Sequence, residues 1–220
     1  MQAMLTRRSA GDGPTLGIHL EDSPRRLEVE TFIRDVYAEH FAARLGALMP
    51  VLVTLCDGDG RIQAAAGLRP ADLRGLFVEN YTRAPIEHVL HAATGERVGR
   101  GRIIEVGNLA TRAPGSARVL FRAMTSWLYE QGFDWVVFAG TIDVRAVFRR
   151  MGVELVALCD ADPSCLGDAR HDWGSYYENE PVVMAGSIVE GCHALGLQRA
   201  PLALLTQLAL SSVNPALCPG

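Results

Sequence analysis

One stretch near the middle of the chain combines residues that bind phosphate with residues that move protons. An apolar, β-branched run that carries Glu105 and Asn108 ends in a Gly/Pro turn, and an amphipathic stretch with helical spacing follows at once. A junction between a strand and a helix presents backbone N–H groups, which bind anions. The sequence therefore predicts a loop that holds a phosphorylated carrier against a strand edge. The residues of this predicted loop are Leu109, Ala110, Thr111, Arg112, Gly115, Ser116, Ala117 and Arg118.

Two polar residues interrupt the strand that leads into this loop. Lone carboxylates are seldom buried without a partner or a purpose, so Glu105 either accepts a proton in a reaction or pairs with a neighbouring arginine. Asn108 either takes part in the chemistry or caps or bulges the strand.

A second cluster of aromatic and hydroxyl side chains precedes a later strand, at Trp173, Tyr176 and Tyr177. Core packing is the commoner fate of such residues, and a phenol can also donate a proton. The five cysteines are widely spread and contain no CxxC pair, which argues against a disulfide framework and against a zinc site. His88 and His91 lie three residues apart without a convincing third ligand, so no metal site is predicted.

The bulk composition bounds the class of protein. The 220 residues suit one packed domain, because 49% are apolar and 21% are charged. The net charge of −4, without any basic run, gives no reason to expect nucleic acid. No signal peptide and no apolar run long enough to cross a bilayer is visible, so we expect a cytoplasmic protein without a membrane span.

The hydrophobic periodicity predicts a mixed order of elements. Helices are expected at residues 27–45 (with Gly46 as its cap), 86–93, 116–131 and 143–151. Strands are expected at residues 51–56, 61–66, 103–109, 135–139, 155–158 and 181–186, with a short one near 15–20 and a strand or turn at 76–80. This order indicates an α/β (α+β) sheet with helices on it. Residues 1–26 are expected to form a flexible arm, 27–190 the domain, and 191–220 a peripheral helical segment that includes 201–210.

Several short motifs resemble the thermostable hemolysin family over residues 25–190. They are Met49-Pro-Val-Leu-Val, Glu105-Val-Gly-Asn-Leu, Trp135-Val-Val-Phe, Phe148-Arg-Arg-Met-Gly, Trp173-Gly-Ser-Tyr-Tyr-Glu and Val183-Met-Ala-Gly. In the order of its elements this family is similar to the GNAT acyltransferases, especially the acyl-homoserine-lactone synthases. The resemblance implies a GNAT-like mixed, twisted sheet with flanking helices.

The resemblance also implies N-acyl transfer, in which an amine attacks a thioester carbonyl. Glu105 would act as the base, the backbone near Asn108 would hold the oxyanion, and Tyr176 or Tyr177 would protonate the leaving thiolate. Arg34 and Tyr37 match an arginine and an aromatic residue on the first helix of the synthases. Together with the region of Tyr81 and with Trp173, they would bind the acceptor.

Two departures from the pattern bear on the substrates. Asn108 stands where the synthases carry an arginine, and this difference argues against homoserine-lactone synthesis itself. The loop Arg112-Ala-Pro-Gly-Ser-Ala has one glycine and a proline, which is compatible with a larger donor than acetyl-CoA.

The implied co-substrate is therefore acyl-CoA or acyl-phosphopantetheine on an acyl carrier protein, with no permanently bound cofactor. The implied partner is a small-molecule amine acceptor, in signal or secondary-metabolite biosynthesis. Two alternatives stay open: a membrane-active, lytic protein, and a non-catalytic module that binds CoA or a carrier protein.

Overall fold

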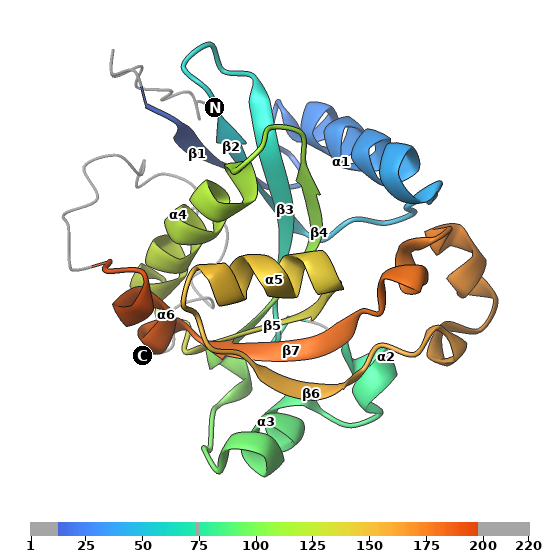
Figure 1. The fold of residues 1–220 in the computed structure, drawn as a ribbon, viewed down its shortest axis with the longest axis vertical. Coiled ribbons are helices and arrows are strands. Elements are labelled where there is room, and N and C mark those ends of the chain that lie inside the picture. The colour runs from blue at the N-terminus through green and yellow to red at the C-terminus, as the bar shows by residue number, and fades with distance from the viewer. Residues whose placement is uncertain (1–12, 74, 198–220) are drawn as a thin grey trace.

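The computed structural model describes residues 13–73 and 75–197 (Figure 1). The first twelve residues of the arm expected at 1–26, and the expected helix at 201–210, lie outside this part of the chain. The described residues form a seven-stranded sheet in the order β1-β2-β3-β4-β5-β7-β6. The predicted mixed sheet with flanking helices is therefore confirmed.

The strands pair antiparallel except for β4 and β5, which run parallel. Their bounds are β1 Thr15–His19, β2 Val51–Cys56, β3 Ile62–Pro70, β4 Ile103–Thr111, β5 Trp135–Gly140, β6 Val156–Asp160 and β7 Val182–Ser187. The predicted hairpin of β2 and β3 is confirmed, and its turn at Asp57 closes through a backbone bond from Gly60.

Helices cover both faces of the sheet. The α-helices are α1 Arg26–Phe41, α2 Glu79–Thr82, α3 Ile86–Thr94, α4 Ser116–Glu130, α5 Ile142–Arg150 and α6 Ile188–Ala194. Short 3-10 helices are η1 Arg100–Arg102, η2 Pro163–Trp173 and η3 Tyr176–Asn179. In Figure 1 the orange segment of η2 and η3 lies between α1 and α2.

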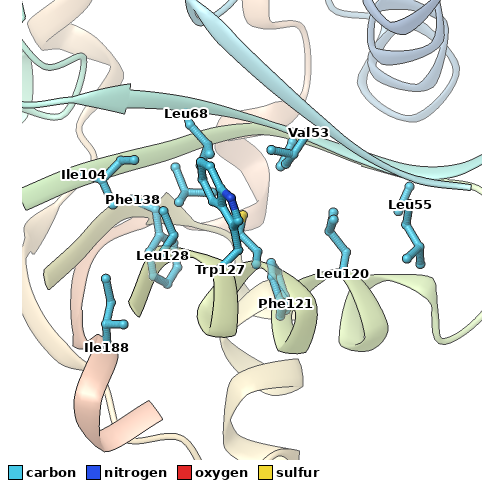
Figure 2. Packing of buried hydrophobic residues seen from close by; sticks show 14 of the residues in the cluster. Val53, Leu55, Leu68, Ile104, Leu120, Phe121, Trp127, Leu128, Phe138 and Ile188 are labelled. Atoms are coloured by element: carbon cyan, nitrogen blue, oxygen red, sulfur yellow. The ribbon is translucent and has the colours of Figure 1, made fainter. Parts of the chain in front are cut away.

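The core is divided by the sheet. On one face, α4 places Leu120, Trp127 and Leu128 against Val53 and Leu68 of the strands (Figure 2). The helices α5 and α6 pack on the same face, whereas α1, α2 and α3 cover the other face. Burying both faces explains why β5 reads as an uninterrupted apolar run.

The parallel pair β4 and β5 separates soon after it begins. Their register joins only Ile103–Glu105 to Trp135–Val137, although β4 continues to Thr111. A bulge in β4 adds to this separation, because its register with β3 shifts between Ala65 and Gly67. Past Glu105, therefore, the edge of β4 that faces β5 pairs with no strand in the described part of the chain.

The end of the first helix differs from its prediction. The first helix ends at Phe41 rather than near residue 45, because Ala42 takes a left-handed φ of 53° and its N–H still bonds to Ala38; Gly46 does not cap the helix. Of the two alternatives predicted for residues 76–80, the structure has the turn, which leads into α2, and the N–H of Glu79 donates to the carbonyl of Leu76.

Candidate active site

A cavity of about 370 Å³ passes through the sheet where β4 and β5 separate. Its lining includes Gly107 and Leu109 of β4 and Phe138 and Ala139 of β5. Other lining residues come from further strands, from loops such as the one after α1, and from helices on both faces of the sheet. The cavity therefore has two chambers joined at the gap between the strands.

The aromatic chamber lies on the face that carries α1 and α2. Rings form its walls, and neighbouring rings touch: Phe77 and Trp173 lie 5.4 Å apart between centroids, and Trp173 and Tyr176 lie 5.2 Å apart. The chamber-forming aromatic residues are Tyr37, Phe41, Phe77, Tyr81, Trp173 and Tyr176. Such a chamber suits a flat or apolar group, with polar groups placed at few points.

The carboxylate of Glu105 faces this aromatic chamber and is only 1% exposed. Its two oxygens accept hydrogen bonds from the N–H groups of Phe77 (2.9 Å) and Val78 (2.8 Å). Burial raises the pKa of Glu105, while these two bonds and the charge of Arg69 act in the opposite direction. A held carboxyl group with a raised pKa is suited to accept a proton.

Asn108 sits at the bulge of β4 and lines the cavity. Its φ of 50° is left-handed, a conformation that asparagine tolerates better than most residues. Its side-chain oxygen accepts a hydrogen bond from the N–H of Met49 at 3.1 Å. The Met49 side chain in turn covers Gly67 and Gly107, where an added Cβ would meet it at 2.7 and 2.5 Å.

The two candidate tyrosines occupy different positions. Tyr176 lines the cavity, and its hydroxyl donates to the carbonyl of Ala139 at 3.1 Å. Tyr177 does not line the cavity; its hydroxyl lies 2.5 Å from that of Tyr81. Burial raises the pKa of Tyr176 well above its ordinary value and that of Tyr177 to about 12, so both phenols stay protonated.

The motif that contains Trp173 is fixed to the end of α1. Gly174 has φ 52° and ψ −129°, and a Cβ there would lie 1.9 Å from the carbonyl oxygen of Phe41. The next residue, Ser175, donates its N–H to that same oxygen at 2.8 Å. Only glycine allows this close approach, which sets the aromatic chamber against α1.

The apolar chamber lies on the opposite face, between α4, α5 and α6. Phe121 of α4 and Phe148 of α5 stack with 4.5 Å between their centroids, and Phe138 of β5 lies 5.3 Å from Phe148. The residues of this chamber are Phe121, Met124, Leu128, Phe138, Val144, Phe148, Leu155 and Ile188. It offers space for a hydrocarbon chain.

The predicted phosphate loop lies beside the cavity, and only Leu109 among its residues lines it. Arg112 turns toward α1, where it pairs with Glu39 at 2.8 Å and lies over the ring of Phe32. Ala110 is buried against α1, and the hydroxyl of Ser116 bonds to a carbonyl within its own turn. At the start of α4, the amides of Ser116 and Arg118 also bond locally.

Among the described residues, the amides of Gly115 and Ala117 have no acceptor, and the side chain of Arg118 is exposed. These two amides and Arg118 lie at the start of α4. Thr111 belongs to β4.

Of the predicted acceptor residues, Tyr37, Tyr81 and Trp173 line the cavity, whereas Arg34 does not. Arg34 pairs with Glu30 at 2.9 Å and donates to the carbonyls of Leu45 and Gly46. It therefore ties α1 to the loop that forms one rim of the cavity.

Sequence reasoning missed several lining residues, chiefly Arg69, Phe41 and Phe77. Arg69 is the register partner of Glu105 across β3 and β4, so both side chains leave the sheet on one face. An isolated arginine in an alanine-rich strand was an available signal. Phe77 lies in the segment that was predicted as a strand or turn, and nothing in its spacing pointed to the site.

Solved structures with the same arrangement define the class of fold. The structure of TofI in a ternary complex with an inhibitor and MTA is 18% identical, with 93% of this chain and all of that chain covered and a TM-score of 0.57. The AHL synthase LasI is 15% identical (84% and 95% covered, TM-score 0.57). FeeM, an N-acyl amino acid synthase from uncultured soil microbes, is also 15% identical (84% and 99% covered, TM-score 0.56). The chain shares the fold of these three proteins.

The sequence profile described as "Thermostable hemolysin" matches residues 19–192. The chain belongs to the thermostable hemolysin family. No curated protein matches it in sequence. Within residues 13–73 and 75–197, no helix combines the length and the apolar character needed to cross a membrane.

Proposed function

We propose that this protein is an N-acyltransferase that moves an acyl group from a thioester to a small amine. The observation that carries the proposal is the position of Glu105, a buried carboxyl group that faces a cavity crossing the sheet. The cavity joins an aromatic chamber to an apolar one, so an acceptor and an acyl chain can approach the gap between β4 and β5 from opposite faces. The acyltransferase fold supports the same reaction class.

Glu105 takes the proton that the acceptor must lose. An ammonium group in the aromatic chamber gives a proton to the carboxylate, directly or through a water molecule, and the neutral amine attacks the thioester carbonyl carbon. A C–N bond forms, the C–S bond breaks, and the nitrogen loses a second proton, which balances the proton that the leaving thiolate takes up. The products are an N-acyl amine and a thiol.

The carbonyl oxygen becomes negative during the attack and needs hydrogen-bond donors. The edge of β4 past Glu105 lacks a neighbouring strand, and the bulge at Asn108 interrupts its ladder with β3. Backbone N–H groups at such an edge are suited to an oxyanion, because they need no rearrangement as the charge develops.

Tyr176 is the better candidate of the two tyrosines for protonating the leaving thiolate. It lines the cavity beside Ala139 at the gap, whereas the hydroxyl of Tyr177 is bonded to Tyr81. A phenol that stays protonated can give its proton to the thiolate once it releases the Ala139 carbonyl.

The acyl donor is acyl-CoA or an acyl carrier protein with its phosphopantetheine arm. The apolar chamber takes the acyl chain, and the free amides of Gly115 and Ala117 beside Arg118 take phosphate at the start of α4. Arg112 is committed to Glu39, so the phosphate contact depends on the other end of the loop. The product class, an N-acyl amine, suits signal or secondary-metabolite biosynthesis.

Thiol release by the purified full chain tests this proposal. Acyl-CoA of increasing chain length and an acylated carrier protein are supplied with a panel of small amines, and the product mass is recorded. We expect thiol release that depends on both substrates and is lost in Glu105→Gln. Tight CoA binding without release with any amine would support a binding module, and dye release from liposomes without thioester would support a lytic protein.

A further inference from the structure

Arg69 and Glu105 form a pair of opposite charges at the base of the aromatic chamber. They are register partners on β3 and β4, and Arg69 Nη1 lies 3.7 Å from Glu105 Oε2. Both line the cavity. At 3.7 Å the contact is longer than a hydrogen bond, so the two groups lie beside each other without being locked together.

Arg69 uses few of its hydrogen-bond donors within the described part of the chain. Arg26, whose side chain is 10% exposed, donates to Glu30 and to the carbonyls of His19, Met49 and Pro50. Arg100, which is 28% exposed, similarly donates to Glu79, Glu87 and a carbonyl.

Arg69 is as sheltered as these two arginines, with a side chain that is 23% exposed. Apart from Glu105, its one polar contact among the residues that the structure describes is a long one, 3.5 Å to the carbonyl of Gly75. The planar guanidinium therefore keeps a fork of N–H groups for an acceptor in the cavity.

The surroundings of the pair define what it can bind. Arg44 adds a second positive charge among the lining residues, and it makes no ion pair with any described residue. The other side chains of the chamber are largely aromatic, and they also include the carboxylate of Asp172 and the amide of Asn108. The chamber thus combines a carboxylate, a neighbouring arginine and a ring-lined space.

We infer that the acceptor is an α-amino acid with an apolar or aromatic side chain. Its ammonium group faces Glu105, its carboxylate binds Arg69, and its side chain lies among the rings of Phe77, Trp173 and Tyr176. This inference rests on the proposed function for the transfer step, in which the amine is acylated as described above. It adds that Arg69 binds the carboxylate of this acceptor.

The two charges explain why an amino acid fits better than its decarboxylated amine. An arginine and a glutamate side by side match the adjacent carboxylate and ammonium of one α-amino acid, and Arg–carboxylate pairs are often bidentate. An amine without the carboxylate leaves the donors of Arg69 unpaired, which a sheltered site penalises.

Equilibrium binding tests this inference without requiring turnover. Calorimetry compares L-phenylalanine with phenethylamine on wild type, Arg69→Met, Arg69→Lys and Arg61→Met. Arg61 is a matched control because it lies in the β2–β3 turn, highly exposed and paired only with Asp59. Circular dichroism checks that each variant is folded.

We expect wild type and Arg61→Met to prefer the amino acid by about 10-fold or more. Arg69→Met should lose this preference while still binding the amine, and Arg69→Lys should keep part of it. The ratio between the two ligands within one variant cancels any effect of Arg69 on the charge of Glu105. Equal affinity of wild type for both ligands, or no amino-acid binding, would overturn the inference.

Thiol release separates this inference from the proposed function. Release with phenethylamine as fast as with L-phenylalanine would support the transferase and reject the role of Arg69. Amino-acid binding that depends on Arg69, without release from any thioester, would support the acceptor site and reject the transferase.

Discussion

The side chain of Asn108 accepts a hydrogen bond from the backbone of Met49 at 3.1 Å, across the bulge of β4. This bond joins the strand that borders the gap to the loop in front of β2, 59 residues earlier in the chain. It holds the left-handed backbone of Asn108 and places the Met49 side chain over Gly67 and Gly107. The shape of the gap therefore depends on a contact that is distant in sequence.

Two substitutions at Asn108 should separate the backbone requirement from the hydrogen bond. Asn108→Gly keeps the left-handed φ and loses the bond, at a cost of about 1 kcal/mol in the free energy of unfolding. Asn108→Ala loses both, at a cost of about 2 kcal/mol. Urea unfolding measures both, and equal losses would show that the positive φ carries no strain.

Glu105→Gln should abolish transfer without preventing folding. Glutamine has one carbonyl oxygen for the two N–H groups of Phe77 and Val78, so one bond is lost, yet a buried charge is removed as well. We expect the free energy of unfolding to change by at most about 2 kcal/mol and thiol release to fall by at least about 100-fold. Full activity in the folded variant would exclude Glu105 as the base.

The pH profile should report the ionisation of Glu105. The base must be ionised, and burial raises its pKa, so kcat/KM should rise with pH at values above the ordinary range of glutamate. Arg69 lowers the pKa of Glu105, so Arg69→Met should move this limb to higher pH. Initial rates at saturating thioester measure the limb, and an identical limb in both proteins would contradict the assignment.

The raised pKa of Glu105 also has a consequence for stability. A carboxyl group whose pKa is raised on folding stabilises the folded state fully below its unfolded pKa. That contribution is lost as the pH rises through the higher folded pKa. Wild type should therefore lose stability relative to Glu105→Gln over this window, as measured by urea unfolding at several pH values.

His19 should make the protein less stable in acid. It is 8% exposed, its Nε2 lies 2.9 Å from Thr54 Oγ1, and burial lowers its pKa from 6.5 to about 4, with Arg25 acting in the same direction. Below pH 6.5 the unfolded state takes up a proton that the folded state refuses. The free energy of unfolding should fall by about 2 kcal/mol between pH 6.5 and about pH 4, after allowance for solvent screening, and should then level off.

Glutamine at position 19 keeps a side chain that can bond to Thr54 and cannot titrate, so His19→Gln should remove this pH dependence. His88→Gln, at an exposed histidine, should leave it intact. Urea unfolding at several pH values between 7 and 4 measures all three proteins. The same slope in wild type and His19→Gln would assign the acid sensitivity to other groups.

Gly174→Ala and Gly167→Ala form a matched pair. The two glycines share nearly the same backbone angles, φ 52° and ψ −129° against φ 56° and ψ −133°. A Cβ at Gly167 meets nothing within 4 Å, whereas one at Gly174 meets the Phe41 carbonyl. We expect a loss of about 1 kcal/mol for Gly167→Ala and at least about 3 kcal/mol for Gly174→Ala. Equal losses would mean that the contact with α1 is not tight.

The order of elements could be predicted because each is specified locally. The apolar run of β5 and the spacing of Leu120, Met124 and Leu128 in α4 need no distant partner to be recognised. The end of α1 could not be predicted. Ala42 adopts its left-handed conformation next to a segment more than 130 residues away, where the N–H of Ser175 reaches Phe41.

A residue of the candidate site could be predicted where its type is unusual for its element. It could not be predicted where its position depends on how distant strands and side chains pair. Glu105 stood out as a carboxyl group in an apolar strand. Its cross-strand partner Arg69 depends on the register of β3 and β4, which the bulge shifts. Arg112 stays a predicted phosphate contact because it precedes a Gly/Ser turn, and its ion pair with Glu39 of α1 joins two distant elements that spacing along the chain does not reveal.

A channel that crosses a β-sheet has a consequence for the last step of a reaction carried out inside it. After transfer, the N-acyl amine extends through the gap between β4 and β5. Its amine part lies in the aromatic chamber and its acyl chain lies in the apolar chamber. The product has to leave along its long axis, because one of its two parts must first pass through the gap between the strands. The rate of product release should therefore fall as the acyl chain lengthens, even where the rate of bond formation is unchanged.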